Sequence, residues 1–121
     1  MILEYVAHSA AADIRRLAAP AALGSAVLSR GAEEHAGFST QSARATTDVT
    51  GAYRIVLACE LVAAIRALRL RQIRPAAPAL AAAFDLAARA LPASTADRPL
   101  DTDLDIAQDL LPGLAQLATV A

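Results

Sequence analysis

The longest helical pattern in the chain, from Thr47 to Arg71, most constrains how it can fold. Its apolar residues recur every three or four positions, which is the spacing of one face of a helix. That face comprises Val49, Tyr53, Val56, Leu57, Glu60, Leu61, Ala64 and Leu68. If one helix ran from position 33 to position 71, it would be about 58 Å long at about 1.5 Å per residue. A compact globule of 121 residues is only about 35 Å across. Such a helix would either break at Gly51 or need a partner.

The rest of the chain also reads as helices separated by prolines. Residues 1–19 show an apolar face and end at Pro20, because proline lacks the amide donor that the next turn needs. Residues 20–31 are expected to form a loop, and the long helix is expected to begin near Ala32. Pro75 and Pro78 mark the next boundary, since proline is tolerated in a first helical turn. A third helix is then predicted over residues 79–91, with its buried side formed by Leu80, Phe84, Leu86 and Ala87. A loop over residues 92–101 and a short helix over residues 103–111, ended by Pro112, complete the prediction.

Alanine dominates the composition, with 33 of the 121 residues. Alanine is the strongest helix former, whereas aromatic residues make up only 3% of the chain. We therefore predict an all-α fold: one helical domain over residues 1–121, with a thin core in which helices approach closely.

Charge and cysteine content exclude several functional classes. The net charge of -1 gives no electrostatic basis for binding nucleic acid or an anionic membrane. The single cysteine, Cys59, excludes an internal disulfide and suits a reducing compartment. The longest run without charge, residues 17–29, is too short to cross a bilayer. A cytoplasmic location is expected, with no metal site and no membrane partner.

One segment, residues 29–39, places two carboxylates beside a histidine, at Glu33, Glu34 and His35. It resembles the Ser-x-Asn-Gln-Glu-Asp-His-Val-Ser-Met segment of histidine ammonia-lyase and its aromatic-lyase relatives. Other similar segments are Met1-Ile2-Leu3-Glu4-Tyr5, Leu17-Ala18-Ala19-Pro20-Ala21, Leu57-Ala58-Cys59-Glu60-Leu61-Val62-Ala63-Ala64 and Asp97-Arg98-Pro99-Leu100-Asp101-Thr102-Asp103. The resemblance covers nearly all of this chain but only the final portion of the family's chain. It implies the carboxyl-terminal part of the ammonia-lyase fold, a bundle of long helices.

The resemblance makes Glu33 the candidate catalytic residue and Glu33 with His35 the candidate substrate-binding residues. In lyases that this chain resembles, the equivalent Glu lies close to the substrate amino group, where a carboxylate can pair with an ammonium or accept its proton. The alternative is structural: Glu33 and Glu34 could be acids of a helix start, where exposed amides favour negative charge. A lone histidine such as His35 is also often structural.

Three further residues near the family-like segments have structural interpretations. Glu60 is expected to form an ion pair with an arginine of this or a neighbouring chain, because a buried carboxylate must be paired. Tyr5 and His8 are interpreted as packing residues.

The departures from the family pattern limit this assignment. Gly31, Ala32 and the pair Gly37-Phe38 replace Asn, Gln and Ser-Met of the family, which puts a histidine substrate in doubt. The family's electrophile, methylidene-imidazolone (MIO), forms from an Ala-Ser-Gly tripeptide that this chain lacks, since Ala93-Ser94 is followed by Thr95. The chain itself therefore cannot form the cofactor.

The leading hypothesis is the small subunit of a split ammonia-lyase or aminomutase. It would supply core helices and Glu33 to a hetero-oligomer that also self-associates. A larger chain would carry Ala-Ser-Gly and MIO and would act on an amino-acid-like small molecule. The alternatives are a non-catalytic helical scaffold or regulator derived from a lyase, and a fragment of a full lyase. In each case the isolated chain is expected not to behave as a compact monomer.

Overall fold

The computed structural model describes residues 2–24, 26–32 and 37–119, and within them it contains helices and no strand. The elements are α1 (Ile2–Leu17), two short 3₁₀ turns (Ala21–Gly24 and Ser29–Gly31), α2 (Ser39–Leu70), α3 (Pro78–Ala90) and α4 (Asp101–Thr119). The predicted all-α fold is confirmed. Pro20 and Pro78 bound α1 and α3 as expected, and Pro78 occupies the first turn of α3, where a missing amide donor costs nothing.

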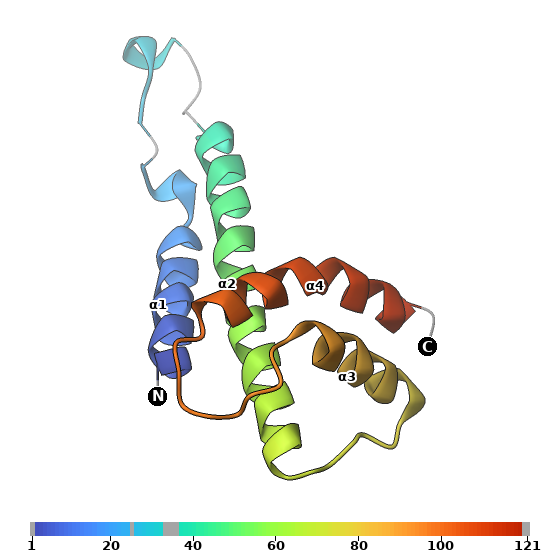
Figure 1. Ribbon diagram of the computed structural model, residues 1–121. Coiled ribbons are helices and arrows are strands. Elements are labelled where there is room, and N and C mark those ends of the chain that lie inside the picture. Colours follow the sequence, from blue (N-terminus) through green and yellow to red (C-terminus); the bar gives the residue numbers. More distant parts are fainter. Residues whose placement is uncertain (1, 25, 33–36, 120–121) are drawn as a thin grey trace.

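The α2 helix is the axis around which the other helices pack (Figure 1). The α1 helix lies alongside it, α4 crosses it, and α3 packs against α4. The buried apolar cluster gathers around the carboxyl-terminal half of α2 and comprises Ala58, Val62, Ile65, Ala87, Leu91 and Ala107. Three of these six are alanines, so the helices approach closely and the core is thin, as the composition predicted.

The predicted start of the long helix near Ala32 is wrong. Gly37 and Phe38 are not helical, and α2 begins at Ser39. Phe38 has φ 48°, a left-handed conformation that cannot continue a right-handed helix, and its carbonyl accepts the first helical hydrogen bond from the Ser42 amide at 3.0 Å.

The α2 helix passes through Gly51 without a break. Its 32 residues give a length of about 48 Å at about 1.5 Å per residue. The amino-terminal part of α2 extends beyond α3 and α4 (Figure 1). The helix was expected either to break at Gly51 or to need a partner, and α2 does not break there.

The buried face of α2 differs from the predicted face. Ala58, Cys59, Val62 and Ile65 are its buried residues. Tyr53 is 55% exposed, and Glu60 and Ala64 are also exposed. Small Ala58 and Cys59 lie at the contacts between helices, so the side that packs is the one that permits close approach rather than the one with the largest side chains. On α3, Leu80 was expected to be buried but is 62% exposed.

The predicted end of the last helix at Pro112 is also wrong, because α4 continues through Pro112 to Thr119. Proline at position 112 removes the amide that would bond to the carbonyl of Gln108. Arg54 of α2 donates to that carbonyl instead, with Nη2 at 3.1 Å from the oxygen. A side chain 54 residues away in sequence thus satisfies the acceptor that the proline leaves free.

Candidate functional site

The predicted site residues Glu33 and His35 lie outside the described residues, as does Glu34. The described residues on either side have unusual backbone conformations. Ser29 and Arg30 precede them with φ 50° and 55°, and Phe38 follows with φ 48°. A non-glycine residue with positive φ costs on the order of 1–3 kcal/mol, and such residues concentrate at functional sites. Three of them therefore flank the segment that resembles the lyase motif.

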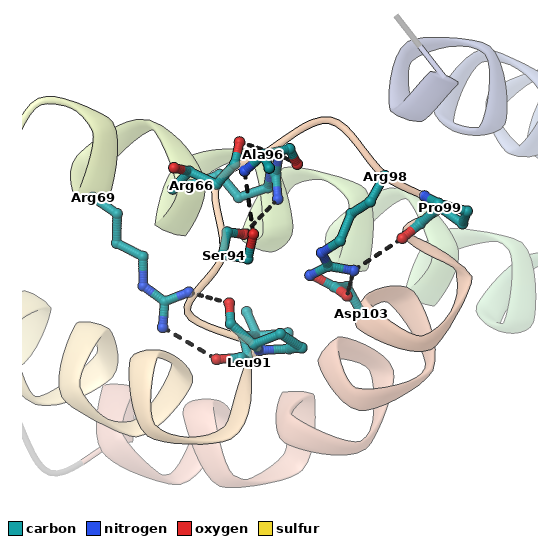
Figure 2. A network of polar contacts seen from close by, with 10 residues as sticks. Arg66, Arg69, Leu91, Ser94, Ala96, Arg98, Pro99 and Asp103 are labelled. Carbon is teal, nitrogen blue, oxygen red and sulfur yellow. Dashed lines mark hydrogen bonds and ion pairs between the residues drawn. The ribbon is translucent and has the colours of Figure 1, made fainter.

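A network of arginines organises the connection between α3 and α4 (Figure 2). Arg66, on α2, donates to the carbonyls of Ser94, Thr95 and Ala96 at 3.0, 2.8 and 2.9 Å. Arg69, one turn further along α2, donates to three carbonyls at the end of α3, those of Ala88, Leu91 and Pro92. These two side chains thus donate to six backbone carbonyls at the end of α3 and in the loop that follows it.

The loop that Arg66 holds shows whether residues of this chain fit the formation of MIO. The Ala93-Ser94-Thr95 stretch is the nearest match to Ala-Ser-Gly, and it lies in the loop held by Arg66. The Ser94 hydroxyl accepts a hydrogen bond from the Ala96 amide at 3.3 Å, and the Ser94 carbonyl is bonded to Arg66. These residues form an ordinary polar turn with no third-position glycine, so they do not fit the cofactor.

The Asp97–Asp103 segment forms a buried ion pair. The Arg98 guanidinium contacts both carboxylate oxygens of Asp103, at 2.8 Å each, and Asp103 is only 1% exposed (Figure 2). Arg98 also donates to the carbonyl of Pro99 at 2.9 Å. The carboxylate raises the pKa of the Arg98 guanidinium further above its usual range. Asp103, at the start of α4, thus fixes the loop that enters this helix.

A cleft of about 470 Å³ lies next to this ion pair, between the first turns of α1 and the loop that enters α4. Ile2, Val6 and Leu104 contribute apolar walls, and Asp97 and Asp101 contribute carboxylates. None of its lining residues was a predicted site residue. Among the described residues, no group of three or more His, Cys, Asp and Glu side chains could hold a metal ion.

The remaining singled-out side chains are not arranged as a catalytic set. Glu60 is exposed in the single chain and belongs to none of the ion pairs that the described residues form, so the expected burial is not observed, whereas an ion pair with a neighbouring chain stays a prediction. Tyr5 and His8 are exposed as well, so neither packs into the core. Cys59 is buried, and burial, together with the neighbouring Glu60 charge, raises the pKa of its thiol. A raised pKa keeps the thiol protonated, so Cys59 is no nucleophile at neutral pH.

Sequence reasoning missed the residues that hold the described polar network. The network depends on three arginines that donate to backbone carbonyls 19 to 54 positions away in sequence, namely Arg54, Arg66 and Arg69. Local spacing in the sequence cannot predict partners at such separations. A signal did exist for Arg98 and Asp103, because both belong to a family-like motif that was noted without a role.

The sequence model of the family described as "Aromatic amino acid lyase" matches residues 1–89. That is well over half of the 121 residues. The chain belongs to the aromatic amino acid lyase family.

Several of the curated relatives are histidine ammonia-lyases. The histidine ammonia-lyase of Geobacillus thermodenitrificans is 34% identical over 105 residues, covering 87% of this chain and 21% of that protein. The Sorangium cellulosum enzyme is 34% identical over 121 residues, or 99% of this chain and 23% of the relative. Histidine ammonia-lyase 1 of Fusobacterium nucleatum is 30% identical over 112 residues, with 92% and 22% covered. No solved structure matches the chain.

This family member spans only about a fifth of the length of the curated relatives it matches. The part that the family model matches includes the segment of Glu33 and His35, the whole of α2 and nearly all of α3. Within the described part of this lyase-family chain, no helix is long and apolar enough to cross a membrane.

Proposed function

We propose that this chain is the small subunit of a split ammonia-lyase-like enzyme. The observation that carries the proposal is a combination: the family's Glu33 segment and long helix are present, whereas the tripeptide that forms MIO is absent from the sequence. A separate, larger lyase-like chain would contain Ala-Ser-Gly and MIO. The assembled hetero-oligomer would act on an amino-acid-like small molecule as a carbon–nitrogen lyase or an aminomutase.

In this proposal Glu33 is the catalytic contribution of the chain. A carboxylate beside a substrate amino group can hold the ammonium by charge, or accept its proton as a general base. His35 would contact the same substrate. The left-handed residues Ser29, Arg30 and Phe38 on either side of this segment support a functional role, since strained backbone persists where the surroundings demand it.

The helices contribute a rigid support for that segment. The α2 helix begins just after Phe38 and is anchored at its other end by Arg66 and Arg69, which bind the connection between α3 and α4. Its amino-terminal part extends past the core of this chain, where a larger chain has room to pack (Figure 1).

The test begins with a search beside the gene of this chain for a truncated lyase-like reading frame that contains Ala-Ser-Gly, and the two chains are then co-expressed. Ammonia release and β-amino acid formation from histidine, tyrosine and phenylalanine are both measured on the co-purified complex, because an aminomutase keeps the amino group in its product. Glu33→Gln should lower kcat by about 10²- to 10⁴-fold, as expected for loss of a general base. Its matched control, Glu34→Gln, removes the same charge from the adjacent position and should leave turnover nearly intact.

Size-exclusion profiles of both variants show whether the complex still assembles. Equal, small effects of the two substitutions on kcat would show that Glu33 is not catalytic. A complex that assembles but contains a Glu33-independent activity would instead support the non-catalytic scaffold.

A further inference from the structure

We propose that the amino-terminal part of α2 is a conformational device that opens and closes independently of the core. This part, which we call the α2 arm, comprises residues 39–51. When the arm opens, its helical hydrogen bonds break while α3, α4 and the rest of α2 stay folded. The opening concerns this chain alone, so it goes beyond the proposed function and requires no larger chain.

The arm has almost no share in the core. The amino-terminal part of α2 extends beyond α3 and α4 (Figure 1). None of the arm's residues, all of which the structure describes, is buried, and only Ala45 and Val49 are half-buried. The buried residues of α2 all lie beyond the arm, at Ala58, Cys59, Val62 and Ile65. Because packing supplies most of a protein helix's stability, and isolated helices shorter than about 12–15 residues are marginal in water, the arm is weakly held.

The two half-buried residues pack only loosely against the end of α1. Ala45 and Val49 line a cleft of about 300 Å³, and Leu17 and Pro20 line it from the other side. Atoms that face such a space lose the dispersion contacts that a filled interface would give them. The end of α1 therefore lies beside the arm but contributes little to hold it closed.

The sequence of the arm also weakens its helix. Thr46, Thr47 and Thr50 donate their hydroxyls to the carbonyls four residues earlier, at 2.9, 3.2 and 3.0 Å. Such bonds slightly destabilise a helix and can bend it. Gly51 ends the arm, and only proline is less favourable than glycine inside a helix. Four residues within one and a half turns thus favour opening.

The two ends of the arm differ in how they are anchored. At its start, Phe38 occupies the cap position with a left-handed backbone and an apolar side chain, and the first turn contains no acidic residue. The free amides there lack the side-chain acceptors and negative charge that usually stabilise a helix start. Beyond its end, Arg54 ties α2 to α4 through the Gln108 carbonyl at 3.1 Å. The helix can therefore open from Phe38 as far as Gly51, where tertiary contacts take over.

An open arm would uncouple the segment that precedes α2 from the core. That segment joins α2 at Phe38, so only a closed arm holds it at a fixed distance from α3 and α4. The support that α2 gives to the Glu33 segment in the proposed function is then complete only when another chain packs on the arm. This consequence rests on the proposed function, whereas the opening itself does not.

The test is hydrogen exchange of the whole chain, followed amide by amide by NMR at urea concentrations below the unfolding transition. Relative to their intrinsic rates, amides 43–51 should exchange about 100-fold or more faster than amides 59–66, because a local opening costs far less than global unfolding. Urea should accelerate amides 59–66 steeply and amides 43–51 only slightly, because a local opening exposes less surface.

Two matched substitutions at exposed positions of α2 separate the arm from the core. Gly51→Ala should slow amides 43–51 about four- to fivefold, as the helix propensities of the two residues predict. Alanine fits there, because beyond the helix's own backbone nothing lies within 4 Å of where its Cβ would stand. Ala64→Gly makes the reverse change in the other half of α2. It should accelerate amides 59–66 by a similar factor and leave amides 43–51 unchanged, since the arm opens without melting position 64.

Equal acceleration of the two groups of amides by urea, or by Ala64→Gly, would show that α2 unfolds as one unit and would overturn the proposal. Amides 59–66 that are as unprotected as amides 43–51 would overturn it too, since no core then outlasts the arm. A Gly51→Ala chain with unchanged exchange at amides 43–51 would exclude Gly51 from any opening unit. These outcomes need neither a larger chain nor ammonia release, so this proposal and the proposed function can fail separately.

Discussion

At the scale of single residues, the Arg98–Asp103 pair is the most buried of the ion pairs that the described residues form. Removal of the Asp103 carboxylate leaves the partly buried guanidinium of Arg98 with the Pro99 carbonyl as its remaining hydrogen-bond partner among the described residues. An unsatisfied, largely buried polar group costs about 1–3 kcal/mol. We therefore expect Asp103→Ala to lower the free energy of unfolding by about 1–3 kcal/mol, measured by urea denaturation.

The matched control is Asp13→Ala, because Asp13 forms an exposed ion pair with Arg16 three residues later. Exposed pairs of this kind contribute about 0.2–1 kcal/mol or less. Equal losses for Asp13→Ala and Asp103→Ala would contradict the role given to the buried pair.

A second ion pair makes part of the stability dependent on pH. Arg74, in the connection before α3, bonds to both carboxylate oxygens of Asp85, and this bonding lowers the pKa of Asp85. A carboxyl group with a lowered pKa in the folded state binds protons less readily there than in the unfolded state. It therefore stabilises the fold above the unfolded pKa, and this stabilisation is lost as pH falls through the folded pKa.

We expect the Tm of the wild type to exceed that of Asp85→Asn at pH 7, and the difference to shrink as pH falls from about 5 toward about 2. Thermal unfolding of both proteins across this pH series measures it. A difference that stays constant over the series would show that Asp85 does not contribute through its charge.

At the scale of elements, α4 shows how a helix tolerates an internal proline. Arg54 satisfies the Gln108 carbonyl that Pro112 leaves without an amide donor. We expect Arg54→Met to lower the free energy of unfolding by about 0.5–1.5 kcal/mol. In a Pro112→Ala background the alanine amide can bond to Gln108, so the same substitution should cost less.

The measurement is a double-mutant cycle by urea denaturation with Arg54→Met, Pro112→Ala and both. A coupling of about 0.5 kcal/mol or more is expected for residues that share one acceptor. Strictly additive costs would mean that the carbonyl does not depend on Arg54.

The three prolines at helix boundaries or inside a helix show which elements could be predicted from the sequence. Pro20 ends α1 and Pro78 opens α3 as expected, because the effect of those prolines is local. Pro112 ends nothing, because a donor from another helix compensates for it. The α2 helix starts at Ser39 rather than near Ala32 because Phe38 has a left-handed backbone. The spacing of apolar residues gives no sign of that conformation. Among the site residues, Glu33 and His35 came from family resemblance, whereas the carbonyl partners of Arg66 and Arg69 depend on tertiary packing.

At the scale of the whole molecule, the chain has a long axis and a thin core. Six buried residues, three of them alanine, hold α2, α3 and α4 together, while Tyr53, Leu70 and Leu80 are largely exposed. The packing face of α2 could not be read from side-chain size alone, since close approach favoured Ala58 and Cys59 over Tyr53.

The purified chain alone should release no ammonia from histidine, tyrosine or phenylalanine. A carboxylate such as Glu33 can take a proton, but elimination also needs a group that accepts electron density as the carbon–nitrogen bond breaks. Ala-Ser-Gly is absent from the sequence, and the nearest stretch, Ala93-Ser94-Thr95, forms a turn whose carbonyls are bound by Arg66.

The measurement follows urocanate, coumarate and cinnamate by absorbance, with the chain produced in a host that has no lyase gene. The positive control is the same preparation mixed with the larger chain described under the proposed function. Because general acid–base catalysis alone supplies only about 10²- to 10⁴-fold, far short of typical enzymatic accelerations, the chain by itself should remain at background. Product formation by the chain alone would mean that it holds an electron sink of its own, and would remove the need for a second subunit.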